Sequence, residues 1–113
     1  MPNSTSSKGR DGEDRAVALL EAAGYRILER NVRVPGGEID VVCLDGRTLV
    51  FVEVKQRSGA AFGSALHGVD APKRKRLRRA AADYAQIVAP AARFRFDVVA
   101  LDGNRPQLHR NAF

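Results

Sequence analysis

The sequence predicts a single α/β domain, and three observations lead to this prediction. The chain has 113 residues, a length that suits one domain and is too short for two. Two stretches carry apolar residues at three- and four-residue spacing, which is typical of amphipathic helices. Five further stretches are rich in alternating or β-branched apolar residues, which favours strands. In chain order these stretches predict the arrangement α-β-β-β-α-β-β.

The first predicted element is a helix over residues 11–23, with Gly24 at the position where a helix would end. Residues 1–8 are polar, and we expect them to form a flexible tail ahead of a folded domain over residues 9–113. Residues 27–34 are β-rich but contain charged side chains, so we expect a half-exposed or bulged strand there.

A β-hairpin follows this strand. Its two strands are expected over residues 39–44 and 49–55, and Asp45-Gly46-Arg47-Thr48 joins them. Asp-Gly between two apolar runs is a strong hairpin signal, because both residue types tolerate the positive φ angles of tight hairpin turns.

The second half of the chain begins with a Gly- and Ala-rich loop over residues 58–68. A helix over residues 70–89 comes next, with Pro72 in its first turn, where the missing N–H costs nothing. Two more strands are expected, over residues 93–101 and 106–110.

The composition is that of a basic protein, which favours a polyanionic partner over the alternative that the charge only keeps the protein soluble. Lys and Arg number 19 against 13 Asp and Glu, which gives a formal charge of +6. Cys43 is the only cysteine, which excludes an internal disulfide and favours a reducing compartment. No apolar run approaches the ~20 residues that span a bilayer, and the N-terminus lacks the apolar stretch of a secretory signal. We therefore expect a cytoplasmic protein with no membrane partner.

Three polar residues interrupt the apolar strands of the hairpin. Glu53 and Lys55 are two residues apart, so they share one face of their strand. A four-residue loop would place Asp40 opposite Glu53, and a two-residue Asp45-Gly46 loop would place it opposite Phe51, on the same face either way. Facing carboxylates repel unless a cation lies between them, and oxygen ligands suit Mg²⁺ or Mn²⁺. These residues therefore predict a metal site in which the lysine assists phosphodiester hydrolysis.

Glu13 is a further candidate for this site. It precedes Ala16, Val17 and Leu20 at helical spacing, so we expect it on the inward stripe of the first helix. The alternative interpretation is an acid that is stabilised by the dipole at the start of the helix.

The second helix carries a dense basic run. Six cations fall within seven residues, namely Lys73, Arg74, Lys75, Arg76, Arg78 and Arg79. Such density repels itself unless a polyanion lies against it, which favours phosphate binding over the alternative of a solubilising helix face. Lys73 lies four residues before Leu77, at the start of the apolar stripe, which allows it to point toward the sheet.

Motifs along the chain, from about residue 9 to residue 113, resemble the YraN family of small bacterial proteins. They are Gly12-Glu13, Gly37-Glu38-Ile39-Asp40, Phe51-Val52-Glu53-Val54-Lys55 with Arg57, Lys73, Arg95-Phe96-Asp97 and Asn111-Ala112-Phe113. That family is similar to the restriction-endonuclease-like PD-(D/E)xK superfamily, and most closely to archaeal Holliday-junction resolvases. The resemblance implies a central mixed β-sheet flanked by helices, an Mg²⁺-dependent DNA endonuclease site and, in many members, a homodimer.

The resemblance also implies a role for each matching residue. Asp40 and Glu53 would bind the metal, Lys55 would be the catalytic lysine, and Glu13 would be the first-helix acid of the resolvase branch. Arg57 would lie near the phosphate. Ile39 stands where the superfamily motif has its proline, a position that varies across the superfamily.

We therefore predict a metal-dependent DNA endonuclease that acts on structured or branched DNA. No base-reading motif is evident, which favours recognition of DNA shape and backbone. Two alternatives remain open. One is a non-catalytic nucleic-acid-binding module that uses the basic helix over residues 70–89, and the other is RNA processing.

Overall fold

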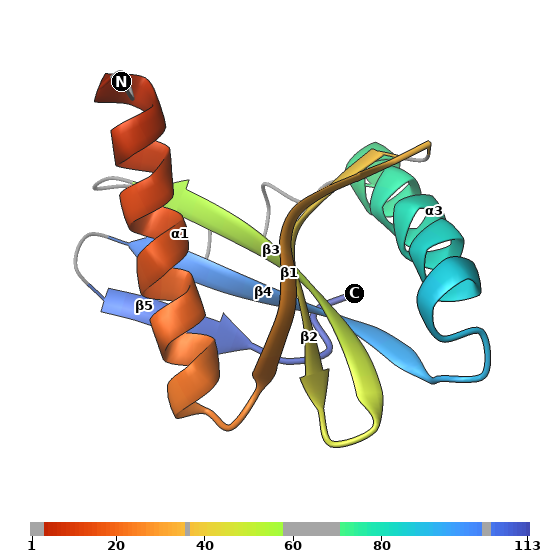
Figure 1. Cartoon of the computed structure of the whole chain (residues 1–113). Helices are drawn as coiled ribbons and strands as arrows, with labels where there is room; N and C mark the ends of the chain where they lie inside the picture. Colours follow the sequence, from red (N-terminus) through yellow and green to blue (C-terminus); the bar gives the residue numbers. More distant parts are fainter. Residues whose placement is uncertain (1–3, 36, 58–70, 103–104) are drawn as a thin grey trace.

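The structure, a computed structural model, describes residues 4–35, 37–57, 71–102 and 105–113 (Figure 1). Within these residues the elements follow the predicted order α-β-β-β-α-β-β. Their bounds are α1 Ser4–Ala22, β1 Arg26–Val34, β2 Gly37–Asp45, β3 Thr48–Arg57, α3 Ala71–Val88, β4 Phe94–Asp102 and β5 Arg105–His109. The loop expected over residues 58–68 lies outside the described part of the chain. Neither α1 nor α3 is long and apolar enough to cross a membrane.

The start of α1 differs from the prediction. We expected a tail through residue 8 and a helix from residue 11, whereas the helix begins at Ser4. The cost of forming a helix falls mainly on its first turn, and each further residue then adds a hydrogen bond. Polar residues without an apolar stripe can therefore extend a helix that is already anchored by packing further along.

The five strands form one mixed sheet in the order β1-β2-β3-β4-β5. Only β3 and β4 run parallel; the other neighbouring pairs are antiparallel. A parallel pair needs a long crossover, and α3 lies within that connection. This arrangement agrees with the mixed sheet flanked by helices that the family resemblance implies.

The β2–β3 hairpin has the register that the four-residue connection predicts. Leu44 is opposite Leu49, and Asp45 and Thr48 form the last pair before the turn. Gly46 has a φ of +61°, which a glycine adopts without strain. The alternative register, with a two-residue loop at Asp45-Gly46, is wrong.

The two helices cover opposite faces of the sheet, as Figure 1 shows. The core beneath α1 consists of Ala16, Leu20, Tyr25, Val41, Cys43, Val50, Val52, Val99 and Leu101. The core beneath α3 consists of Val32, Ile39, Val42, Leu49, Phe51, Leu77, Ala80, Ala81, Tyr84, Ala85, Phe96 and Val98. The alternation of side chains along each strand divides the apolar residues between these two cores.

A polar cluster is buried at the α1 face of β4. Asp97 is 0% exposed, and its carboxylate accepts hydrogen bonds from the Tyr25 hydroxyl at 2.8 Å, Arg95 Nε at 3.0 Å and the Asn111 backbone N–H at 2.9 Å. Arg95 also donates to Asp45 at 2.9 Å. The cluster therefore joins the residue before β1, the end of β2 and the segment after β5 to one buried carboxyl group.

The sheet opens between β2 and β3 at the end opposite their turn. The β2–β3 ladder stops at the pair Val41–Val52, and the first residues of β2 pair only with β1. Figure 1 shows the ribbon of β1 and β2 curving away toward α3. Ile39 and Val42 both belong to the core under α3, so the alternation of faces along β2 is interrupted between them. Asp40 lies at this fork.

Candidate active site

Asp40 lies in the opening between β2 and β3. Its Oδ2 accepts a hydrogen bond of 2.8 Å from the backbone N–H of Val54. This contact replaces a rung of the ladder, because the carboxylate takes the amide hydrogen that β3 would otherwise direct at the β2 backbone. The prediction that Asp40 pairs directly opposite Glu53 is therefore wrong in detail, since pairing ends one residue earlier.

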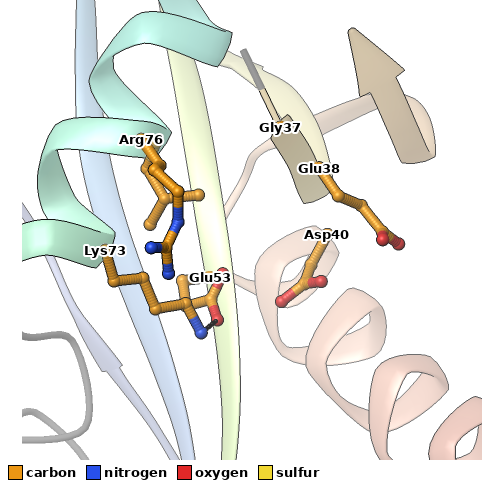
Figure 2. Close-up of a pocket in the computed structure, with 7 residues that line it drawn as sticks. Gly37, Glu38, Asp40, Glu53, Lys73 and Arg76 are labelled. Atoms are coloured by element: carbon orange, nitrogen blue, oxygen red, sulfur yellow. Dashed lines mark ion pairs between the residues drawn. The ribbon is translucent and has the colours of Figure 1, made fainter. Parts of the chain in front are cut away.

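Glu53 pairs with two lysines on the face of the sheet that α3 covers. Glu53 is 7% exposed, and its Oε1 lies 3.9 Å from Lys55 Nζ and 2.6 Å from Lys73 Nζ. Figure 2 shows Lys73 reaching from its helix to this carboxylate. The predictions that Glu53 and Lys55 share a face, and that Lys73 points toward the sheet, are confirmed.

Burial and the neighbouring Glu53 shift the pKa of Asp40. Burial raises the pKa of Asp40 to about 7, and the negative charge of Glu53 and a side-chain hydrogen bond with it act in the same direction. The hydrogen bond from Val54 opposes this shift but does not outweigh it. The two carboxyl groups are thus near neighbours, which is an arrangement that costs free energy when both are ionised.

The two lysines also influence each other. A side-chain hydrogen bond with Lys73 and burial lower the pKa of Lys55, and the charge of Lys73 contributes as well. Burial lowers the pKa of Lys73, but its hydrogen bond with Glu53 and the negative charges of Glu53 and Asp40 outweigh burial, so the pKa is raised. Lys73 therefore holds its proton more firmly than Lys55 does.

Two pockets meet at Asp40. The first, of about 280 Å³, lies between the sheet and α3 and is lined by Gly37, Glu38, Asp40, Glu53, Lys73, Arg76 and Leu77 (Figure 2). The second, of about 200 Å³, lies toward α1 and is lined by Gly12, Glu13, Asp40, Val54 and Gln56. The Asp40 carboxylate is therefore accessible from both sides of the fork.

Glu13 faces the sheet, as its helical spacing predicts. Its Oε1 accepts hydrogen bonds from Arg30 Nε at 2.9 Å and Asn31 Nδ2 at 3.0 Å. The neighbouring Gly12 lies close to the sheet, since a Cβ at that position would lie 2.8 Å from Gln56 Oε1 and 3.2 Å from Leu101 Cδ1. Glu13 borders the α1-side pocket behind Asp40 and does not join the group around Glu53 in the α3-side pocket.

The partners of Glu13 were missed by the sequence analysis. Arg30 and Asn31 are among the residues that break the apolar pattern of β1, and Asn31 has a φ of +54°. Asn adopts this left-handed conformation more readily than most residues. The polar residues that interrupt the apolar pattern of β1 could therefore have indicated these partners, because they include the two side chains that donate to Glu13.

The basic run on α3 is divided among several partners. Lys73 contacts Glu53, and Arg76 lines the pocket beside it. The guanidinium groups of Arg74 and Arg78 lie 5.5 and 5.8 Å from the centre of the Phe113 ring, which stacks on Phe96. Lys75 and Arg79 are exposed. Arg57 is the last residue of β3, and its side chain lies outside the described part of the structure.

The donor set at the fork fits a hard divalent cation. Mg²⁺ is usually bound by one or two carboxylates and completes its coordination with water and substrate phosphate. Asp40 and Glu53 provide such a pair, and a cation between them would offset their repulsion. No cluster of three or more His, Cys, Asp or Glu side chains that could hold a metal occurs among the described residues. The two carboxylates therefore suit Mg²⁺ or Mn²⁺ better than a metal that needs a full cage of side chains.

The raised pKa of Asp40 predicts that the metal-free protein loses stability as the pH rises. An Asp carboxyl in an unfolded chain titrates near 3.9, so between about pH 4 and pH 7 the folded chain binds the additional proton. The free energy of unfolding should therefore fall across this range. Asp40→Asn should remove this slope and make the metal-free protein more stable at about pH 8, by roughly 4 kcal/mol at most.

Urea unfolding in EDTA at several pH values measures this effect. Asp14→Asn is the matched control, because Asp14 forms an exposed ion pair with Arg30 and should leave the slope unchanged. An Asp40→Asn protein that keeps the pH dependence of the unaltered chain would contradict the prediction.

Comparison with known proteins places this chain in a family. Residues 12–101 match the sequence model of the family described as "Uncharacterised protein family UPF0102". A UPF0102 protein of Dechloromonas aromatica is 46% identical over 111 residues, which cover 98% of this chain and 92% of the relative. A UPF0102 protein of Shewanella loihica is 47% identical over 107 residues, covering 95% and 94%, and one of Moorella thermoacetica is 53% identical over 95 residues, covering 83% and 79%.

Proposed function

We propose that this chain, which belongs to the uncharacterised protein family UPF0102, is a metal-dependent endonuclease that hydrolyses phosphodiester bonds in DNA, with structured or branched DNA as its substrate. The family membership confirms the resemblance to the YraN family. The activity is our inference from the site.

One observation carries the proposal. Two neighbouring carboxylates, Asp40 and Glu53, meet at a fork in the sheet, and Lys55 lies on the same face as Glu53 at 3.9 Å. Mutually repelling acids that are largely removed from water cost stability unless they serve a purpose. Binding a cation would offset this cost, and both acids line the pocket of about 280 Å³ in which a phosphate would meet that cation.

The chain's own residues would divide the work of hydrolysis. Asp40 and Glu53 would hold the cation, and Lys55 would donate a hydrogen bond to the phosphoryl oxygen as negative charge develops on it. A bound Mg²⁺ or Mn²⁺ supplies Lewis-acid polarisation and a lower pKa for the attacking water. Arg76, at the wall of the same pocket, is placed to neutralise an adjacent phosphate.

The exposed cations of α3 support DNA as the substrate. Lys75 and Arg79 are exposed one helical turn apart, and Arg76 extends this basic surface to the pocket. Such a surface binds the phosphate backbone without reading the sequence, which suits recognition by shape. A homodimer would place two such sites on two strands, as the family resemblance implies.

A cleavage panel tests the proposal. The purified chain is incubated with four-way junctions, flaps, plain duplexes and matching RNA substrates, with Mn²⁺ or with EDTA. We expect nicking of at least one branched DNA substrate in Mn²⁺ and none in EDTA. Absence of metal-dependent cleavage on every DNA substrate would contradict the proposal, and cleavage confined to RNA would redirect it to RNA processing.

Lys55→Met is expected to slow this cleavage by roughly 10²-fold, because it removes one charge-stabilising donor from the transition state. Mn²⁺ binding should persist, since Asp40 and Glu53 are intact. Single-turnover rates measure the effect, and isothermal titration with Mn²⁺ provides the control. A Lys55→Met protein that cleaves at the normal rate would remove this lysine from the mechanism.

The second candidate function is a nucleic-acid-binding module without turnover. The 2.6 Å contact between Lys73 and Glu53 favours it, because this ion pair gives the buried acid a partner in the absence of metal. Both candidates predict DNA binding that weakens as salt increases. They differ in their dependence on metal. The binding module would bind DNA equally well with and without Mn²⁺ and would not cleave it.

A further inference from the structure

Lys73 occupies an unusual place among the cations of α3. Its Nζ lies 2.6 Å from Glu53 Oε1, which is the length of a direct charge-assisted contact, whereas Lys55 Nζ is at 3.9 Å from the same oxygen. Glu53 is 7% exposed, so its carboxylate needs a nearby cation to offset the cost of burial. In the metal-free protein that cation is Lys73.

We propose that Lys73 competes with the divalent cation for Glu53, so that the metal binds at the expense of this ion pair. The inference rests on the proposed function, because it takes Glu53 as a metal ligand. It assigns to the chain a residue that sets metal affinity and that does not itself coordinate the metal.

Electrostatics gives the direction of the effect. An ammonium in contact with a ligand oxygen repels an incoming divalent cation and also shares the negative charge that would attract it. Both effects weaken metal binding, and both disappear when the ammonium is removed. Lys55 stays in place after that change, so the site keeps one lysine for the substrate.

The position of Lys73 makes displacement feasible. Its side chain is 27% exposed and lines the pocket, so the ammonium has access to water when it leaves Glu53. It comes from α3, a different element from Glu53, and Figure 2 shows it extended across the space between helix and sheet. A long flexible side chain of this kind can move without a change in the fold.

Mn²⁺ titrations of the full chain test the competition. Lys73→Met removes the ammonium and keeps a long side chain, and it should bind Mn²⁺ at least about five-fold more tightly than the unaltered chain. Lys73→Arg keeps a cation on Glu53 and should remain within about three-fold of the unaltered affinity. Lys75→Met is the matched control for Mn²⁺ affinity, because Lys75 is exposed on the same helix, and it should change that affinity by less than about two-fold.

The melting temperature, with and without Mn²⁺, is a second readout that shows whether the variant is folded. Because Lys73→Met removes the nearer of the two lysines that pair with Glu53, the metal-free variant should be less stable, and saturating Mn²⁺ should raise its melting temperature more than that of the unaltered chain. Lys73→Gln replaces Lys73→Met in both measurements if the methionine variant does not fold.

The outcomes separate this inference from the proposed function. If Lys73→Met binds Mn²⁺ with unchanged or weaker affinity while Glu53→Gln loses it, Lys73 serves only to orient the acid: the competition is wrong and the metal site stands. If Glu53→Gln binds Mn²⁺ as tightly as the unaltered chain, the metal site at the fork and the competition both fail.

Discussion

Glu53→Gln is expected to lower the rate of Mn²⁺-dependent DNA cleavage by at least about 10³-fold. The change removes one of the two carboxylates that would hold the cation, and a bound cation contributes several kcal/mol to the transition state of phosphoryl transfer. DNA affinity without metal should be unchanged or slightly higher, because the substitution removes a negative charge near the phosphate path. Single-turnover cleavage and equilibrium binding measure the two quantities separately.

Glu21→Gln is the matched control for this experiment. Glu21 is an exposed glutamate on α1, outside the residues that line either pocket at the fork, and its substitution should leave both cleavage and binding unchanged. A Glu53→Gln protein that cleaves within a few-fold of the unaltered rate would show that the fork is not the catalytic centre.

Asp97→Ala is expected to destabilise the protein by about 3 kcal/mol, because it removes one partner from a buried ion pair. The substitution leaves Arg95, the Tyr25 hydroxyl and the Asn111 N–H without the acceptor that they share. Such a loss is a large fraction of the stability of a small domain. The change in the urea midpoint at constant m value measures it.

Asp14→Ala provides the comparison for Asp97→Ala. Asp14 also pairs with an arginine, at 2.6 Å from Arg30, but its side chain is 56% exposed. An exposed ion pair contributes little, so this substitution should cost less than about 1 kcal/mol. Equal losses of unfolding free energy in the two variants would mean that burial does not increase the contribution of the Asp97 cluster to stability.

The sequence was informative wherever a short-range pattern decides the structure. Asp-Gly between apolar runs predicted the hairpin and left two registers open, and the two-residue period placed Glu53 and Lys55 on one face. The spacing from Lys73 to Leu77 allowed that lysine to point inward, as it does. These features depend on residues close together in the chain.

The geometry at Asp40 could not be predicted in the same way. The ladder ends there because the ribbon of β1 and β2 curves toward α3, and the carboxylate then takes the Val54 N–H. That curvature depends on packing between elements distant in sequence: a Cβ added to Gly37 would lie 3.9 Å from the backbone oxygen of Arg76 on α3. The register predicted correctly that the two acids lie close together. It predicted wrongly that the ladder continues to the pair Asp40–Glu53, because the ladder ends at Val41–Val52.

The partners of the basic run also depend on tertiary packing. Apart from Lys73, the spacing did not distinguish the cations of the run, yet Arg74 and Arg78 lie over the Phe113 ring. The segment after β5 places Phe113 against α3, and no local sequence pattern predicts the contact of its ring with Arg74 and Arg78. Lys75, Arg76, Arg78 and Arg79 remain exposed, whereas Lys73 and Arg74 are half-buried.

Mn²⁺ titration of the metal-free chain, followed by calorimetry, tests the central claim most directly. If Asp40 and Glu53 hold one cation together, the unaltered chain binds one Mn²⁺, and Asp40→Asn and Glu53→Gln each weaken that binding by about ten-fold or more. Affinities that remain the same in all three proteins would contradict the account.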